Sequence, residues 1–473
     1  MGRTRTLGIM AAACAVLGVA ARIASAQNAF WLDELWSYLL VRLTAPSVHQ
    51  IFFNLSHDNN HILNSVFLLL LGDRQSWFWY RAPSLVLGSL SIWLCALAAG
   101  RGKSPARSVA AILCSLSFAM ILYSSEARGY AGAFFFGLCA FLLYERIHTR
   151  AGKVPVGLFW LSCCLGLLSQ LSFVHVYLSL LAWGLWLLRR EENRKRGMVR
   201  LAILHLPVLA FMAFLYVVHV RGMWVGGGPV YGPGQVLVTT LSVAMGGEKF
   251  GLPAVLAALA GAFTTIAALV HLRRTRDERF FFFLMVLFAV PVAVLFIARP
   301  GRLYFRYFVV CYPFLYAAMA QMLGDGTGGG RGRAALSWAF VAVFALSNLL
   351  LLGRFLDTGR GGYPQAVRFL AQNTPGPAIT VGSDDDYLGP KMLLFYSRLL
   401  PRGKEFLYAN KETIPSAPPR WFIIQPQDQN EHPSPRIQLP GGTRYVLVQT
   451  YPYSGFSGFS WYVYRRLPGP VGQ

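Results

Sequence analysis

The chain has 473 residues, of which 55% are hydrophobic, 14% are aromatic and only 13% are charged. Because a soluble globular protein carries about 25% charged residues, this composition excludes an ordinary soluble fold and indicates a polytopic membrane protein. The formal net charge of +23 would suggest a nucleic-acid partner in a soluble chain. Here the placement of the basic residues along the chain accounts for the charge, and we expect no nucleic-acid partner.

Eleven apolar stretches are candidates to cross the hydrocarbon core of a bilayer, which takes about 20 helical residues. We expect spanning helices near residues 7–26, 81–100, 107–124, 128–145, 154–169, 173–188, 199–219, 252–271, 280–298, 305–323 and 334–353. The fifth and sixth are short, so a single bent or re-entrant pair is an alternative for them. The expected fold is therefore a polytopic α-helical membrane protein.

The first apolar stretch admits two interpretations. It follows "MGRTRT" and ends in "ASAQ" (24–27), which together resemble a secretory signal with an A-x-A cleavage site. The alternative is an uncleaved first spanning helix. In both cases the residues that follow lie outside the cell.

Basic residues cluster in every second connection between the predicted helices, at 101–107, 145–153, 189–200, 273–279 and 328–333. Together with Arg3 and Arg5, these connections hold 20 of the 43 Lys and Arg residues. The positive-inside rule places them in the cytoplasm. We therefore expect a multi-pass protein of the plasma (inner) membrane, with a cytoplasmic N-terminus and an external or periplasmic C-terminal region.

Residues 27–80 become the first external loop in this topology. Within the loop, "HILNSVFLLLLG" (61–72) is apolar but too short to span a bilayer. We expect it to form an amphipathic helix along the membrane interface, with "WFWY" (77–80) as an aromatic anchor.

The chain changes character after residue 353, where the apolar runs shorten and Pro and Gly become more frequent. The patterns predict a helix at 365–376, buried strands at 378–382 and 421–426, and a strand pair at 444–451 and 461–466. We therefore divide the chain into a transmembrane domain, residues 1–353, and a small external C-terminal α/β domain, residues 354–473.

The order of the motifs in the first third of the chain resembles a known family. A first external loop with "DE" at 33–34 and an interfacial helix are followed by "YRAPSLVLG" (80–88) and "YSSEARGYA" (123–131). This arrangement is similar to the integral-membrane glycosyltransferases of the C superfamily (GT-C), which include the protein O-mannosyltransferases and the lipid A aminoarabinose transferases. The resemblance implies a GT-C-like fold and an inverting transfer of a hexosyl or pentosyl group from a polyprenyl-phosphate sugar at the external face. The acceptor it implies is a glycan, a glycolipid or a protein.

The acidic pair Asp33 and Glu34 lies among aromatic residues in "FWLDELWSYLL" (30–40). Glycosyl transfer to a hydroxyl needs a base for the acceptor proton, and negative charge stabilises its oxocarbenium-like transition state. The resemblance implies that Asp33 is this base, and we expect Glu34 to orient it or to help to hold a metal ion. The alternative is that both are solvated residues at the start of an interfacial helix.

Arginines on the expected external side are candidates for binding the donor phosphate, because a guanidinium can form two hydrogen bonds to one phosphate group. Arg81 and Arg128 begin two predicted helices, and Arg302 and Arg306 follow Arg299 in "ARPGRLYFRY" (298–307). The alternative is that they anchor lipid headgroups. For Arg128, a structural salt bridge with Glu126 is a further alternative.

His57, Asp58, His61 and Glu126 are predicted substrate-binding residues. His57 and His61 would share one face of a helix, a spacing that can bind a divalent metal ion, but no third ligand is apparent. We favour hydrogen bonding to substrate or backbone, and a divalent metal ion stays open.

Two other motifs have simpler interpretations. "SDDDY" (383–387) lacks the ligand spacing of a calcium loop and is interpreted as a solvated turn. The glycine-rich stretch "VGGGPVYGPG" (225–234) is interpreted as a mobile external loop that covers the site as a lid.

Two other functions compete with transfer. A transporter or lipid flippase would place acidic or polar residues along a path through the helix centres. The predicted centres hold no acidic residue, and polar residues gather at the external ends, which favours a site at the interface. An inactive scaffold that binds lipid or a partner is the third hypothesis.

Overall fold

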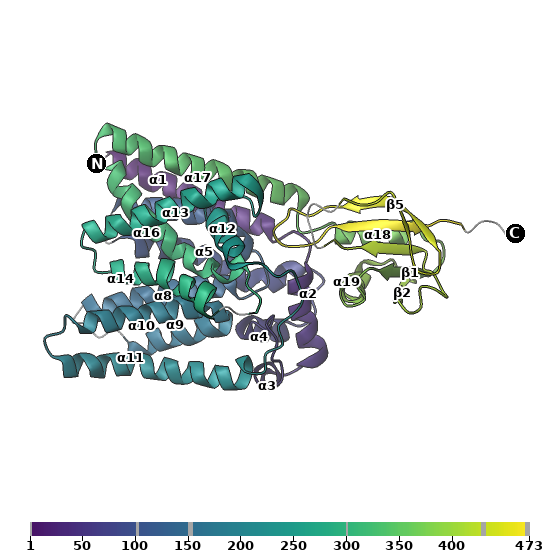
Figure 1. Cartoon of the computed structure of the whole chain (residues 1–473), viewed down its shortest axis with the longest axis horizontal. Coiled ribbons are helices and arrows are strands. Elements are labelled where there is room, and N and C mark those ends of the chain that lie inside the picture. The colour runs from purple at the N-terminus through teal and green to yellow at the C-terminus, as the bar shows by residue number, and fades with distance from the viewer. Residues whose placement is uncertain (1, 101–103, 150–154, 299–300, 427–431, 469–473) are drawn as a thin grey trace. The chain divides into compact units, whose positions relative to one another are not determined.

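The structure is a computed structural model of the chain, and it describes residues 2–100, 104–149, 155–298, 301–426 and 432–468 (Figure 1). The chain divides into two compact units. The first comprises Met1–Ala26 and Leu40–Leu352, and the second comprises Gln27–Leu39 and Gly353–Gln473.

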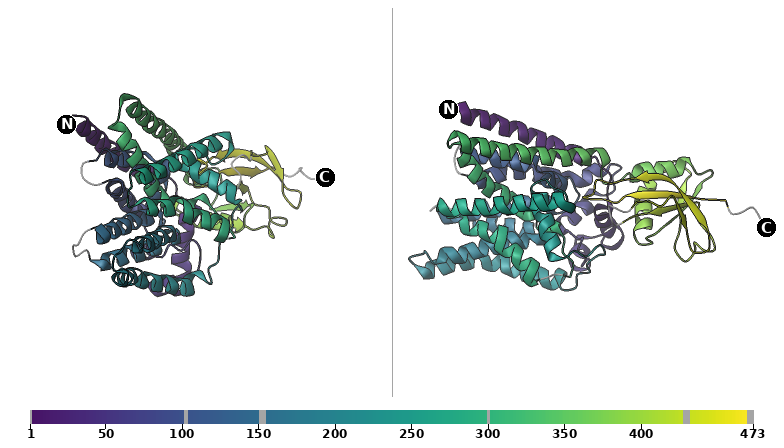
Figure 2. Two further views of the ribbon diagram at one scale, coloured as in Figure 1. Left: turned by 60° about the vertical axis from the view of Figure 1, so that its left-hand side comes forward. Right: turned by 45° about the horizontal axis from the view of Figure 1, so that its top comes forward.

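Nine helical runs in the described part of the chain are long and apolar enough to cross a membrane. The helices that form them are α1 (Gly2–Ser25), α5 (Ala82–Ala99), α8 (Tyr130–Thr149), α10 (Val174–Leu188), α11 (Arg194–Leu215), α13 (Gly251–Arg274), the run from α14 (Phe280–Leu284) to η6 (Val294–Ala298), α16 (Tyr312–Thr327) and α17 (Arg331–Thr358). Figure 2 shows from two further sides that helices of the first unit lie side by side. The prediction of a polytopic helical membrane protein is confirmed.

The count of spans differs from the expected eleven at two places. The predicted helix 107–124 is a pair, α6 (Pro105–Leu116) and α7 (Phe118–Ser124), bent by 61° and counting as a tenth span. The predicted helix 154–169 is α9 (Val156–Ser169), which has 14 residues. At about 1.5 Å per residue it is shorter than a hydrocarbon core of about 30 Å.

The break between α6 and α7 is stabilised by polar side chains from other helices. Ser117 caps the start of α7, and its hydroxyl lies 2.8 Å from the hydroxyl of Tyr316 on α16. The Phe118 amide donates to Asn348 Oδ1 at 2.7 Å, and Asn348 Nδ2 donates to the Phe344 carbonyl at 2.8 Å. Because backbone polar groups inside a membrane protein must find internal partners, these contacts stabilise the bend. The bend precedes the segment that carries Glu126 and Arg128.

Short helices lie between α1 and α5 in the first unit. They are η1 (Leu40–Thr44), α3 (Val48–Phe53), α4 (Ile62–Leu71) and η2 (Trp77–Arg81). The helix predicted over 61–72 is present as α4, with His61 as its N-terminal cap residue. Its ten residues cannot span a bilayer.

The middle of the first unit contains further short elements. They are η3 (Leu171–Phe173), η4 (Tyr216–Val220), α12 (Pro233–Ala244), η5 (Met285–Ala289), α15 (Val290–Ala293), η7 (Phe305–Tyr307) and η8 (Val309–Cys311).

The second unit is built around a six-stranded sheet in the order β2-β1-β3-β6-β5-β4. The strands are β1 (Ala378–Ser383), β2 (Glu405–Ala409), β3 (Trp421–Ile424), β4 (Arg436–Gln438), β5 (Arg444–Tyr451) and β6 (Trp461–Arg466). β1 pairs in parallel with β2 and β3, and the pairs β3–β6, β6–β5 and β5–β4 are antiparallel.

The helices of the second unit are α2 (Leu32–Leu39), α18 (Tyr363–Gln372) and α19 (Leu388–Tyr396), followed by η9 (Ser397–Leu399). The helix and four strands predicted after residue 353 are all present. The strands β2 and β4 and the helix α19 were not predicted. The acidic segment Gln27–Leu39, which we assigned to the transmembrane domain by position in the sequence, clusters with this unit.

Candidate active site

Charged side chains from four segments of the first unit interact in one polar cluster. We define the polar cluster as Asp58, His61, Glu126, Arg128, Lys249 and Arg306, which are linked by electrostatic interactions. They come from the loop before α4, the segment between α7 and α8, the loop between α12 and α13, and η7. Two of the six are arginines, one is a lysine, two are carboxylates, and the sixth is the imidazole of His61.

Arg128 is buried and held in a defined orientation. Its Nε donates to His61 Nε2 at 3.3 Å, and its Nη2 donates to Asn59 Oδ1 at 2.9 Å. Its guanidinium carbon lies 5.1 Å from the centre of the Tyr130 ring. Ser84 also donates to the Arg128 carbonyl at 3.0 Å. A guanidinium oriented in this way is prepared to bind an anion at little further cost in conformational entropy.

A close approach of two helices fixes where Arg128 lies. Gly129 follows it, and a Cβ atom built on Gly129 would lie 1.5 Å from the carbonyl oxygen of Ser169, the last residue of α9. Only glycine fits there, so α8 can begin directly against the end of α9.

The two histidines do not form the helical pair that the sequence suggested. His57 forms a β-bridge with Trp224 and His61 caps α4, so residues 57–61 are not one helix. His57 Nδ1 lies 2.9 Å from Asp58 Oδ1 and 3.0 Å from the Asn59 amide nitrogen. Burial, reinforced by the charge of Arg128, lowers the pKa of His61 well below its ordinary value, so a neutral imidazole accepts from Arg128.

Within the part of the chain that the structure describes, no three His, Cys, Asp or Glu residues lie close enough to hold a metal ion. His57 and Asp58 together offer only two ligands. We assign no metal site, and a divalent metal ion stays a prediction.

Asp58 is kept ionised by its surroundings. Burial alone would raise the pKa of its carboxyl. The hydrogen bond and charge of His57, the Gly226 amide and the charge of Arg306 outweigh this effect, and the pKa lies below its ordinary value. Asp58 therefore contributes a negative charge to the cluster at neutral pH.

The glycine-rich stretch 225–234 begins beside Asp58. The Asp58 amide donates to the Trp224 carbonyl at 3.0 Å, and Arg302 Nη1 donates to the Gly228 carbonyl at 3.0 Å. Gly228 has a φ of +122°, and a Cβ there would lie 2.8 Å from the Tyr304 hydroxyl. These contacts connect the stretch to the polar cluster, while its predicted role as a mobile lid stays a prediction.

Lys249 is a member of the cluster that we did not predict. It lies in "GGEKF" (246–250). Two hydroxyls from α12 hold this segment: Thr239 donates to the Lys249 carbonyl, and Ser242 donates to the Glu248 carbonyl. Burial, together with the charge of Arg306, lowers the pKa of the Lys249 amine to about 7, although Glu126 opposes the shift. Its signal in the sequence was a lysine in a connection predicted to be external, the same criterion that selected the arginines.

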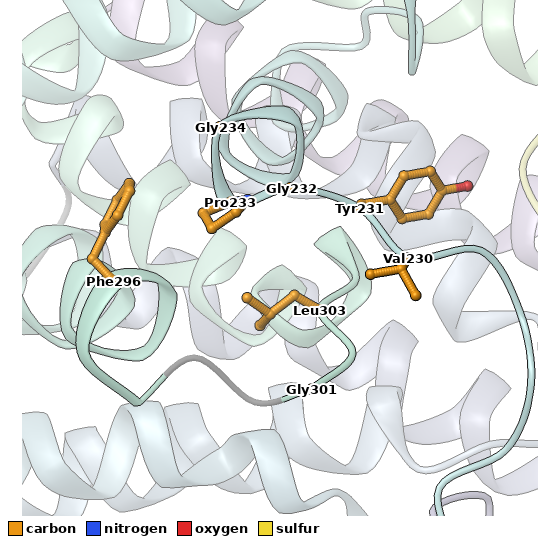
Figure 3. A pocket seen from close by; sticks show the side chains of 8 residues that line it. All are labelled: Val230, Tyr231, Gly232, Pro233, Gly234, Phe296, Gly301 and Leu303. Carbon is orange, nitrogen blue, oxygen red and sulfur yellow. The ribbon is translucent and has the colours of Figure 1, made fainter.

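An apolar pocket adjoins the polar cluster. It has a volume of ≈ 640 Å³ and is lined by Val230, Tyr231, Gly232, Pro233, Gly234, Phe296, Gly301 and Leu303 (Figure 3). The Tyr231 ring lies 5.9 Å from the Tyr304 ring, and the guanidinium carbon of Arg306 lies 4.6 Å from that same ring. Tyr304 therefore lies between Tyr231 of the apolar lining and the guanidinium of Arg306.

Arg81 is buried, and its Nη1 donates to the Ala26 carbonyl at the end of α1 at 2.7 Å. Arg299 lies outside the described residues. The predicted donor-phosphate role of each arginine stays a prediction.

The acidic pair lies on α2 of the second unit. Glu34 is fully buried, and its Oε2 accepts from the Trp31 amide at 3.3 Å, which closes the first turn of the helix. Asp33 is partly exposed. The two acids therefore differ in environment, with Glu34 supporting the helix from which Asp33 projects. The roles predicted for them stay predictions.

The fold is similar to that of ArnT in two solved structures. ArnT from Cupriavidus metallidurans in the apo state matches with a TM-score of 0.55 and 14% identity, over 88% of this chain and 92% of that chain. The same protein bound to undecaprenyl phosphate matches with a TM-score of 0.52 and 13% identity, over 96% and 97%. An oligosaccharyltransferase from Archaeoglobus fulgidus aligns at a TM-score of 0.49. No protein-family model and no curated protein matches the sequence.

At such low identity these similarities show the fold alone. The chain has the fold seen in ArnT, in agreement with the GT-C-like fold that the resemblance of the motifs in its first third implies.

Proposed function

We propose that this protein is an inverting glycosyltransferase that moves a hexosyl or pentosyl group from a polyprenyl-phosphate donor to an acceptor at the external face of the membrane. The observation that carries the proposal is an apolar pocket beside a cationic cluster in a membrane unit of GT-C fold. A lipid-linked phosphate has these two parts, an apolar chain and an anionic head. Undecaprenyl phosphate, which is bound to ArnT in one of the similar structures, belongs to the same chemical class.

The polar cluster is the proposed site for the donor phosphate. Arg128 and Arg306 carry permanent positive charge, and Lys249 adds a third charge when it is protonated. Asp58 and Glu126 balance two of these charges, so the cluster keeps a net charge of +1 that attracts an anion while Lys249 is protonated. The first isoprene units of the donor would occupy the pocket next to Tyr231 and Leu303.

Asp33 is the proposed general base. Its carboxylate takes the proton of the acceptor hydroxyl, and the hydroxyl oxygen forms a bond to the anomeric carbon. The bond between that carbon and the phosphate oxygen breaks at the opposite face of the sugar. The polyprenyl phosphate leaves with the electron pair, and the cluster cations stabilise its charge. Attack opposite the leaving group inverts the anomeric configuration, and the negative charge of Asp33 also stabilises the oxocarbenium-like transition state.

The proposed location follows from the distribution of basic residues. The positive-inside rule places the connections rich in Lys and Arg on the cytoplasmic side of a plasma (inner) membrane. The N-terminus is then cytoplasmic, and the polar cluster, the acidic pair and the C-terminal domain are external or periplasmic. A glycan, a glycolipid or a protein on that side would be the acceptor.

The experiment is transfer in proteoliposomes with radiolabelled polyprenyl-phosphate sugars and an envelope extract as acceptor. We expect labelled product from the wild-type protein and from the control Asp73→Asn. Asp73 is exposed and lies in the predicted first external loop, residues 27–80. We expect none above background from Arg128→Ala combined with Arg306→Ala. Counterflow of labelled lipid without product would instead support a transporter or flippase, and binding without either activity would support an inactive scaffold.

A further inference from the structure

The helix that carries the acidic pair is held by α19, a helix more than 350 positions later in the chain. Both helices belong to the second unit. The contacts between them occur before α2, along it and at its end.

The first contact fixes the point where the chain enters α2. The Tyr396 hydroxyl donates to the Phe30 carbonyl at 2.7 Å, and both residues are fully buried. The Phe30 ring stacks on Phe395, with centroids 5.2 Å apart and planes 19° apart. Phe30 lies three residues before Asp33. The two contacts therefore fix the start of the helical turn that carries the Asp33 carboxylate.

The second set of contacts holds the rest of α2. The Tyr38 ring packs edge-on against Phe395 at 5.6 Å. The Trp36 ring lies 5.1 Å from Tyr387 and 4.5 Å from the ammonium of Lys391. Because residues three apart are neighbours on a helix surface, Trp36 lies beside Asp33.

Tyr396 is itself fixed to the core of the second unit. Its ring lies 5.8 Å from Tyr363, and the Tyr363 ring lies 5.1 Å from Trp461 on β6. The Tyr363 hydroxyl donates to the Arg360 carbonyl and accepts from the Phe459 amide. A buried aromatic series therefore connects the sheet to the start of α2.

We infer that Tyr396 and Phe395 are positioning residues for the catalytic step, so that the C-terminal domain belongs to the catalytic machinery and sets the orientation of Asp33. This inference rests on the proposed function, in which Asp33 is the base. A base that is misplaced by about 1 Å can cost about 100-fold in rate, because proton transfer requires a defined geometry. A carboxylate on a short helix of only eight residues needs support of this kind.

The test is Tyr396→Phe, which removes one hydroxyl and keeps the ring. We expect kcat to fall about tenfold with an unchanged KM for the donor, because the variant moves the base and leaves the donor site intact. Tyr445→Phe is the matched control, since its buried hydroxyl also donates to a backbone carbonyl, that of Pro419 at 2.8 Å. We expect the control to keep the wild-type kcat and to lose a similar amount of thermal stability.

A double-mutant cycle separates positioning from a general structural effect. In an Asp33→Asn background, Tyr396→Phe should lower the residual rate by less than twofold, because there is no base left to orient. Equal losses in both backgrounds, or a wild-type kcat for Tyr396→Phe, would overturn the inference while leaving the proposed function intact. Full activity of Asp33→Asn would overturn the assignment of the base itself.

Lys391→Met provides a second route if Tyr396→Phe does not fold. Lys391 is partly exposed, and the change removes the contact of its ammonium with the Trp36 ring. We expect a loss of about threefold in kcat with an unchanged donor KM, and a wild-type kcat for a folded Lys391→Met protein would overturn the inference.

Discussion

The polar cluster of the first unit and the acidic helix of the second unit hold their charged groups by different means. In the cluster, charged side chains contact polar neighbours directly, as Arg128 does with His61. On α2, aromatic packing and hydrogen bonds to the backbone fix the helix, and Asp33 stays partly exposed. The comparison indicates that one region is suited to bind an anion and the other to present a base. Variants in the cluster should therefore raise KM for the donor, with a loss of kcat as well where they remove a charge that stabilises the leaving phosphate, and variants on α2 should change kcat alone.

The largest expected effect is on the α2 side of this comparison. Asp33→Asn should lower kcat by about 100-fold to 10,000-fold, the usual contribution of a general base, with little change in KM for the donor. Initial rates at several donor concentrations measure both constants, with Asp73→Asn as control. A rise in donor KM without loss of kcat would break the comparison, because it would make Asp33 a binding residue.

The next effect distinguishes two neighbouring arginines. Arg306→Ala should raise donor KM by about 10-fold to 100-fold, since a hydrogen bond to a charged group contributes about 1.5–3 kcal/mol. Arg302→Ala should change donor KM by less than about threefold, because the Arg302 guanidinium donates to the Gly228 carbonyl. Binding of the donor to each purified variant measures the difference in affinity. An equal loss of donor affinity in both variants would contradict a role for Arg306 in binding the phosphate that Arg302 does not share.

A conservative change in the cluster should have a smaller effect. Arg128→Lys keeps the charge but cannot donate to His61 and to an anion with the geometry of a guanidinium. We expect donor KM to rise about tenfold with kcat nearly unchanged. If Arg128→Lys behaves as the wild type, charge alone matters at this position and its orientation by Asn59 and His61 does not.

The smallest expected effect is a dependence of donor binding on pH. The lowered pKa of Lys249, about 7, means that its ammonium is present below that pH and is lost above it. Donor KM should therefore rise by about threefold to fivefold between about pH 6 and about pH 8.5. Lys249→Arg stays charged throughout this range and should flatten the profile. An unchanged profile in Lys249→Arg would assign the dependence to another group.

The sequence allowed the helices to be predicted because each spanning stretch carries its own signal, a run of apolar residues. The strands β1, β3, β5 and β6 were predictable for the same reason, since each is a compact apolar or aromatic run. β4 has only three residues, and α19 follows the polar turn "SDDDY", so neither has a strong local pattern.

The candidate site was only partly predictable. Arg128 and Arg306 stood out as charges at expected external helix ends, Asp58 was selected because it lies between His57 and His61, and Lys249 carries the same signal as the arginines. No local pattern could show that Gln27–Leu39 clusters with the C-terminal domain. That association depends on contacts such as the one between Tyr396 and Phe30, which are far apart in sequence. The helical pairing of His57 and His61 failed because a bridge to Trp224 determines the local backbone.

The close approach at Gly129 makes Arg128 sensitive to a change that alters no charge. A methyl group at residue 129 would overlap the Ser169 carbonyl oxygen and force the first turn of α8 away from α9. In a library of random variants screened for retained transfer, replacements at this glycine should be depleted as strongly as replacements of the arginine beside it. Surveys that score tolerance by charge or hydrophobicity would overlook such a position, because its constraint is purely steric.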